Sequence, residues 1–188
     1  GKSALMSKFI ERCKKLHLEV IFYFISMNRE SRKIQNLISH FAQELWKKGI
    51  IQEKLSSDPM ELRHQLRNSL EKNEKRFVFI IDGLDELEES GLDFLWLPRE
   101  TNIHSRFIFT YRPVLECKIL HNRRFFQEKV LSPLAENCIA DIIDEYVNFH
   151  NLNLDRRDRE LLRKRAKGNP LFLRVALEEI QSSGVAIG

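Results

Sequence analysis

The first residues of the chain are of the types that hold a phosphate. Gly1, Lys2 and Ser3 open a segment whose apolar side chains recur at the spacing of one helix face. At the N-terminus of a helix, backbone N–H groups and the helix dipole favour a bound phosphate, while a lysine reaches its oxygens and a hydroxyl coordinates Mg²⁺. The alternative is a surface tripeptide at a frayed terminus, and the three residues alone do not exclude it.

Three carboxylates follow an apolar run near the middle of the chain. Residues 77–81 (FVFII) predict a buried parallel strand, Asp82 comes directly after it, and Asp85 and Glu86 follow within one turn. Ligands of open parallel sheets bind at the carboxyl ends of the strands, so Asp82 could hold Mg²⁺ directly or through water. Carboxylates this close repel one another unless a cation intervenes. The alternative is an Asp82 that only caps the next helix.

A cation follows the next apolar run. Residues 107–111 (FIFTY) predict another strand, and Arg112 comes directly after it, at the edge where Asp82 is expected. Arg112 could therefore contact a γ-phosphate, or it could pair with one of the nearby acids. The group 168–171 (GNPL) opens the last expected helix. Proline in a first helical turn is ordinary, so this group alone indicates no function.

A sheet covered by helices would bring these residues together. Apolar runs separated by helical patterns favour βα crossovers and a mostly parallel sheet, so the fold class is α/β. The run 20–25 does not alternate, which predicts a strand buried on both faces. The sequence predicts helices over 3–16, 34–45 and 59–70, and strands over 20–25, 77–81, 107–111 and, as a short candidate, 129–131.

The character of the sequence changes after residue 134. Helical patterns cover 139–147, about 155–167 and 170–181, and we recognise no strand there. The expected domains are therefore an α/β core over 1–133 and a helical subdomain over 134–188. Basic residues crowd 155–167 with acids between them, which is typical of a solvated helix face rather than of a nucleic-acid contact.

Composition excludes several classes. Of 188 residues, 43% are hydrophobic and 31% charged, and the net charge is +4, which fits neither a disordered chain nor a strong nucleic-acid binder. The longest apolar runs fall far short of the roughly 20 residues of a membrane span. The three distant cysteines form no metal-binding spacing, so we expect reduced thiols and a cytoplasmic location. The absence of an initiating Met suggests a fragment of a longer protein.

Four motifs in a fixed order carry a resemblance that covers about residues 1–183. Gly1-Lys2-Ser3, FVFIIDGLDEL (77–87), FIFTYRP (107–113) and GNPLFL (168–173) resemble the NACHT-type STAND NTPases, which are P-loop ATPases of the ASCE division that act in signal transduction. The branch that contains nephrocystin-3 and the telomerase-associated protein is especially similar to two stretches: that from Asp82 through LDFLWLP (92–98) to the FIFTYRP strand, and NPLFLRVALEEI (169–180). The resemblance implies a P-loop NTPase sheet flanked by helices, with a C-terminal helical lid subdomain.

The same resemblance implies ATP and Mg²⁺ as cofactors. Gly1, Lys2 and Ser3 would be the end of the Walker A loop, with Lys2 on the β and γ phosphates. Ser3 would bind the metal together with Asp82, the Walker B acid. Pro170 would pack against the adenine from the helical lid.

The resemblance also implies catalytic residues, with two departures. Asp85 or Glu86 would polarise the attacking water, and Arg112 would stand at the sensor position. Tyr111 replaces the small residue usual in the family, and its phenol could alter hydrolysis. The family's first strand and the leading glycine of its phosphate loop do not precede Gly1, so we expect a sheet without its first strand, truncated within Walker A, and a fragment that binds nucleotide weakly or not at all.

Three functions remain open from the sequence. The first is an ATP-dependent conformational and oligomerisation switch, with homo-oligomers or protein partners engaged through flanking domains. The alternative is a non-enzymatic interaction scaffold with a degenerate nucleotide site. A nucleic-acid motor of the same P-loop division is the third, and the balanced charge argues against it.

Overall fold

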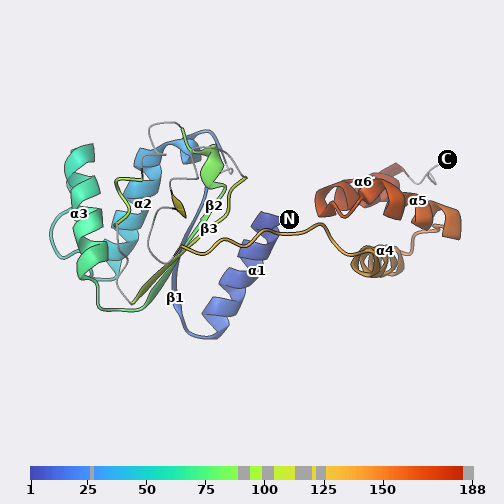
Figure 1. The fold of residues 1–188 in the computed structure, drawn as a ribbon, viewed down its shortest axis with the longest axis horizontal. Coiled ribbons are helices and arrows are strands. Elements are labelled where there is room, and N and C mark those ends of the chain that lie inside the picture. Colours follow the sequence, from blue (N-terminus) through green and yellow to red (C-terminus); the bar gives the residue numbers. More distant parts are fainter. Residues whose placement is uncertain (26–27, 89–93, 99–103, 113–119, 122–125, 184–188) are drawn as a thin grey trace. The chain divides into compact units, whose positions relative to one another are not determined.

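The structure of the protein is a computed structural model that describes residues 1–25, 28–88, 94–98, 104–112, 120–121 and 126–183. The chain divides into two compact units, Lys2–Glu128 and Lys129–Gly188 (Figure 1). None of the helices in the described ranges is long and apolar enough to cross a membrane.

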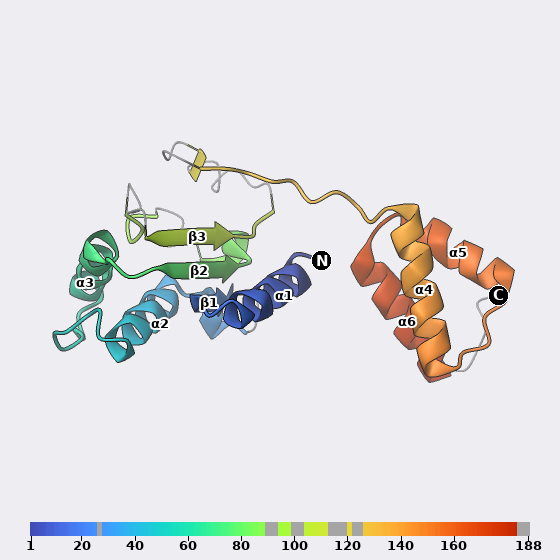
Figure 2. The same cartoon turned by 90° about the horizontal axis from the view of Figure 1, so that it is seen from below.

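The first unit is a parallel sheet with helices on both faces. Its strands pair in the order β1-β2-β3, in a register that places Ile21 beside Phe79 and Phe79 beside Phe107 (Figure 2). The α/β class with a parallel sheet flanked by helices is therefore confirmed. The elements are α1 (Lys2–Lys15), β1 (Glu19–Phe24), η2 (Glu30–Arg32), α2 (Ile34–Lys47), α3 (Pro59–Lys72), β2 (Phe77–Asp82), η3 (Leu84–Glu86) and β3 (Ser105–Phe109).

Alternation along the strands gives the sheet two apolar faces. Phe79 and Phe107 stack with their ring centroids 4.6 Å apart and belong to the core that includes Phe41 of α2. On the opposite face, Ile10 of α1 packs with Ile80. Burial of these side chains fixes both the strand register and the position of α1.

Strand β1 lies at an edge of this sheet and is less buried than the sequence suggested. Phe22 is 37% exposed, so the prediction that residues 20–25 are buried on both faces is wrong. A neighbour covers only one edge of β1 among the described strands. No described strand pairs with the other edge of β3.

The second unit is helical. It contains α4 (Glu136–His150), α5 (Arg156–Ala166) and α6 (Pro170–Ser183), and its own core joins Ile143, Leu162 and Leu177. The predicted strand over 129–131 is wrong, because these residues are exposed and pair with no strand in the described part of the chain. Apolar side chains form a strand only where a neighbouring backbone can accept and donate the ladder hydrogen bonds.

A close approach ties the start of this unit to the turn before α6. Gly168 has a φ of +76°, and a Cβ there would lie 2.4 Å from Cβ of Pro133 and 3.0 Å from the carbonyl oxygen of Leu134. The N–H of Leu134 donates to the Gly168 carbonyl at 2.9 Å. Only glycine fits this position without displacing the backbone.

Candidate functional site

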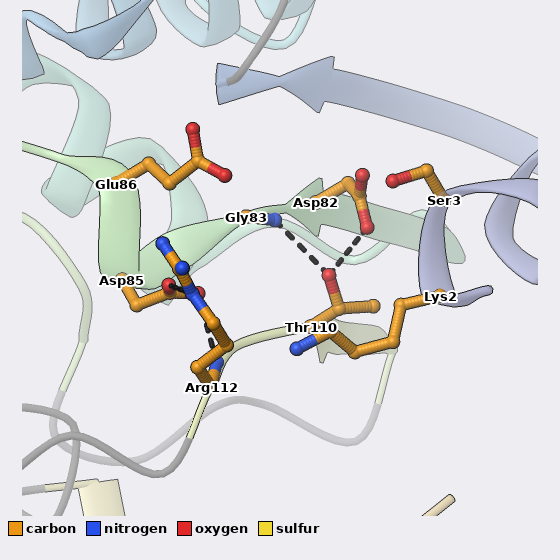
Figure 3. Close-up of a pocket in the computed structure, with 8 residues that line it drawn as sticks. All are labelled: Lys2, Ser3, Asp82, Gly83, Asp85, Glu86, Thr110 and Arg112. Atoms are coloured by element: carbon orange, nitrogen blue, oxygen red, sulfur yellow. Dashed lines mark hydrogen bonds and ion pairs between the residues drawn. The ribbon is translucent and has the colours of Figure 1, made fainter. Parts of the chain in front are cut away.

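A polar cavity of about 230 Å³ opens at the carboxyl edge of the sheet in the first unit. Parallel pairing brings the ends of β2 and β3 to the same edge, and the N-terminus of α1 reaches it from one face (Figures 2 and 3). Residues far apart in the sequence therefore meet here. The lining residues are Lys2, Ser3, Asp82, Gly83, Asp85, Glu86, Thr110 and Arg112.

The start of α1 contributes a cation and a hydroxyl. Lys2 Nζ donates to the Tyr111 carbonyl oxygen at 2.7 Å, so the ammonium lies between the first helix and the end of β3. Ser3 points toward the carboxylate of Asp82 in Figure 3. The structure thus places the expected Walker A and Walker B side chains beside the same cavity.

Asp82 closes β2 and is held by a residue that the sequence analysis did not single out. Its carboxylate is almost fully buried, and its Oδ1 accepts a hydrogen bond from the hydroxyl of Thr110. The N-cap of the turn η3 is Gly83, in the left-handed conformation at φ +79°, so Asp82 is not the helix cap that the alternative interpretation required. The signal for Thr110 was present, since it is the first polar side chain after an apolar strand.

Asp85 and Arg112 form an ion pair across the mouth of the cavity. The backbone N–H and Nε of Arg112 donate to the two carboxylate oxygens of Asp85 at 2.8 and 2.6 Å. Burial on its own would raise the pKa of Asp85, but the hydrogen bonds and the charge of Arg112 hold it below its usual value. The same bond to Asp85 raises the pKa of Arg112. In this structure Arg112 therefore pairs with a nearby acid, Asp85, which is one of the two interpretations that its sequence position left open.

Glu86 pairs with Arg32 at a longer distance. Arg32, from η2, lies 3.5 Å from Glu86 Oε2, and the two side chains are 52% and 27% exposed. The N–H of Glu88 donates to the Arg32 carbonyl at 3.0 Å, which ties η2 to the end of η3. No sequence pattern marked Arg32, because it belongs to a turn that lies distant in the chain from the acids.

The oxygen donors at this cavity fit Mg²⁺. Mg²⁺ takes oxygen ligands and commonly uses one or two protein oxygens together with phosphates and waters. The Ser3 hydroxyl and the second carboxylate oxygen of Asp82 are such donors. Among the described residues, no group of three His, Cys, Asp or Glu side chains is placed to hold a metal ion.

Two expected site residues lie outside the cavity lining. Gly1 precedes α1, and Pro170 begins α6 in the second unit, so their roles stay predictions. The phenol of Tyr111 also does not line the cavity: its hydroxyl donates to Glu128 Oε1 at 2.5 Å. Residue 113, the last of the FIFTYRP motif, lies outside the described residues, as do 89–93 and 99–103 in the stretch from Asp82 to that motif.

The parallel sheet, its crossover helices and a polar cavity at the strand ends define a protein of the α/β class with a candidate ligand site at the carboxyl edge of its sheet. The chain belongs to the family described as nephrocystin 3, N-terminal, whose model matches residues 1–112. This match covers α1 through the end of β3, and so it includes every residue that lines the cavity.

Two mammalian relatives align with nearly the whole chain. It is 26% identical over 199 residues to tetratricopeptide repeat protein 41 of Rattus norvegicus, and 25% identical over 199 residues to the protein of that name from Mus musculus. Both alignments cover 96% of this chain, and the chain spans only about 15% of the length of each relative.

Solved structures of a bacterial protein match the chain at a low level of similarity. RuvB of Thermotoga maritima, described as a Holliday junction branch migration motor, matches with a TM-score of 0.42 and 14% identity, over 97% of this chain and 62% of that one. A likeness at this level is too distant to support an argument about function.

Proposed function

We propose that the chain binds ATP with Mg²⁺ at this cavity and acts as a NACHT/STAND-type signalling module, a switch whose conformation and oligomerisation depend on the nucleotide. The observation that carries the proposal is the meeting of Lys2 and Ser3, at the start of a helix, with Asp82 and Arg112, at the ends of two strands. Cations, a hydroxyl and a carboxylate at one sheet edge are the groups that a metal-bound triphosphate requires.

The size of the cavity supports a phosphate and metal site in particular. Pockets that enclose a whole drug-sized ligand measure about 300–1,000 Å³. At about 230 Å³, this cavity would hold the phosphates and the metal, and the nucleoside would extend beyond it. Lys2 would exchange the Tyr111 carbonyl for phosphate oxygens, while Ser3 and Asp82 would bind the metal, which supplies positive charge to the phosphates when bound.

The contacts support different roles for the two neighbouring acids. Both oxygens of Asp85 accept from Arg112, and its side chain is only 3% exposed, so it is occupied in holding that arginine. Glu86 is more exposed, and within the described part of the chain its carboxylate pairs with Arg32, at 3.5 Å. We therefore assign to Glu86 the polarisation of the attacking water, and to Asp85 the positioning of Arg112 for a γ-phosphate.

The helical unit would complete the switch. Pro170, at the start of α6, would pack against the adenine, and Gly1 would belong to the phosphate loop. A γ-phosphate that draws Arg112 from Asp85 would then favour a different conformation from that with a diphosphate. We further propose that the working form acts in the cytoplasm as a homo-oligomer or with protein partners, consistent with relatives that are named for tetratricopeptide repeats.

ATP binding by the full-length protein tests the proposal. Equilibrium dialysis with ATP and Mg²⁺ should show binding, and Lys2→Ala should weaken it at least tenfold because a charge-assisted phosphate contact is lost. Lys8→Ala is the matched control, since Lys8 lies on the same helix but pairs with Glu11 on the exposed face. The proposal is wrong if the unmodified protein binds no ATP, or if Lys2→Ala binds as tightly as Lys8→Ala.

One observation favours a second function, a non-enzymatic interaction scaffold. Asp85 pairs with Arg112 and Glu86 pairs with Arg32, so two of the acids at the site are neutralised by arginines without a ligand. A scaffold would form the same protein complexes whether or not ATP is present. Dialysis without detectable ATP binding, together with partner binding that nucleotide does not change, would support this function over the switch.

A further inference from the structure

Thr110 holds the turn after β2 at four points. Its backbone N–H donates to the Ile81 carbonyl at 3.0 Å, and its carbonyl accepts from the Leu84 N–H at 2.8 Å. Its hydroxyl oxygen accepts from the Gly83 N–H at 3.0 Å and donates to Oδ1 of Asp82. A single residue after β3 therefore fixes the segment that carries the buried acid (Figure 3).

The direction of the hydroxyl bonds follows from their partners. A backbone N–H can only donate, so the Thr110 oxygen must accept from Gly83. The one hydroxyl proton is then available for Oδ1 of Asp82, which it reaches. This bond uses one carboxylate oxygen and fixes the plane of the group, and Figure 3 shows the other oxygen on the side of Ser3.

Burial makes this arrangement rigid. Thr110 is 7% exposed and Asp82 is 2% exposed. In such a poorly solvated environment hydrogen bonds are strong, and water does not readily replace a lost partner. The neighbouring residues act on the same site, since Tyr111 holds Lys2 and Arg112 holds Asp85.

From this geometry we propose that Thr110 is a positioning residue for the metal: its hydroxyl turns Asp82 so that the free carboxylate oxygen and the Ser3 hydroxyl face one coordination site. The proposal rests on the proposed function, because it concerns the metal of a bound nucleotide. Partners that orient a metal ligand typically change metal affinity 10–100-fold when they are removed.

Mn²⁺ in place of Mg²⁺ gives a readout that does not depend on hydrolysis. With ATP bound to the full-length protein, electron paramagnetic resonance measures free and bound Mn²⁺. Thr110→Val, which keeps the shape but lacks the hydroxyl, should weaken Mn²⁺ binding at least tenfold. Thr110→Ser, which keeps the hydroxyl, should stay within about threefold of the unmodified protein. ATP affinity in EDTA should change less than about twofold in both variants.

A matched control removes a buried hydroxyl elsewhere. Ser31 is 8% exposed, and its hydroxyl donates to the Ile25 carbonyl, so Ser31→Ala tests for a general effect of lost stability. Thermal unfolding confirms that each variant is folded. Mn²⁺ affinity unchanged by Thr110→Val overturns the proposal, and so does an equal loss of ATP binding in EDTA, which indicates a purely structural role.

The outcomes also separate this inference from the function on which it rests. If the unmodified protein binds no ATP, the proposed function fails and the inference fails with it. If ATP and Mn²⁺ bind but Thr110→Val binds Mn²⁺ normally, only the inference fails.

Discussion

At the scale of the residue, the pair of Asp85 and Arg112 makes stability depend on pH. The pKa of Asp85 is lowered in the folded protein, so its contribution is present above the unfolded value of about 4 and is lost as the pH falls through the lowered pKa. Asp85→Asn should therefore reduce the free energy of unfolding by about 1 kcal/mol or more at pH 7, with a smaller difference as the pH falls below about 4.

Urea unfolding followed across this pH range measures the difference. Glu71→Gln is the control, because Glu71 pairs with Arg67 at 3.0 Å on an exposed helix face, where such a pair contributes little. If the free energy of unfolding of Asp85→Asn changed with pH in the same way as that of Glu71→Gln, the pair of Asp85 and Arg112 would not be the source of the pH dependence.

At the scale of the element, α2 contrasts a buried with an exposed aromatic side chain. Phe41 is fully buried against Phe79, whereas Trp46 is 51% exposed. Phe41→Ala should lower the free energy of unfolding by about 3–5 kcal/mol through the cavity it leaves, and Trp46→Ala should stay within about 0.5 kcal/mol. Denaturant unfolding measures both, and equal losses would show that α2 packs through a different face.

The turn before α6 provides a second prediction at this scale. Asn169 Oδ1 accepts from the N–H groups of Leu171 and Phe172 at 2.9 and 3.2 Å, so the asparagine of the GNPL group caps the helix. Asn169→Ala should lower the free energy of unfolding by about 1 kcal/mol. Asn169→Asp should lower it less, because its carboxylate can still accept the two hydrogen bonds. Unfolding of the helical unit measures the difference. An Asn169→Ala variant as stable as the unmodified protein would show that the Asn169 side chain does not stabilise the start of α6.

The sequence predicted the elements better than it predicted their surroundings. Three strands and six helices were expected within a few residues of their bounds, because hydrophobic spacing reflects which face of each element is buried. Exposure of Phe22 was missed, since the composition of a strand does not reveal whether it lies at an edge. The prediction of a strand over 129–131 was wrong for a related reason, because strand pairing depends on a partner that lies far away in the sequence.

The candidate site was predictable where a motif ends an apolar strand. Lys2, Asp82 and Arg112 were named from such positions, and all three line the cavity. Arg32 was not named, because its contact with Glu86 depends on how a turn folds back across the sheet edge. The partner of Arg112 among the acids was left open, since strand order alone does not determine side-chain pairing.

At the scale of the whole molecule, two separate cores predict two unfolding transitions. Gly168→Ala should lower the free energy of unfolding of the helical unit by more than about 2 kcal/mol, because it adds a Cβ 2.4 Å from Pro133 at a positive φ. Gly49→Ala is the matched control in the first unit: its φ is +69°, but nothing lies within 4 Å of the new Cβ, so only about 1 kcal/mol of backbone strain is expected.

Differential scanning calorimetry resolves the two transitions. Each glycine variant should shift the transition of its own unit and leave the other in place. A single transition that both variants shift together would show that the two cores unfold as one.

The contact of Gly168 with Pro133 and Leu134 also joins two places of the helical unit that lie far apart in the sequence. The N–H of Leu134 donates to the Gly168 carbonyl, and the missing side chain of Gly168 leaves room for Pro133. The segments that enter α4 and α6 are therefore held against each other, so a displacement of one carries the other, and Pro170 with it, while the packing of the helices stays the same.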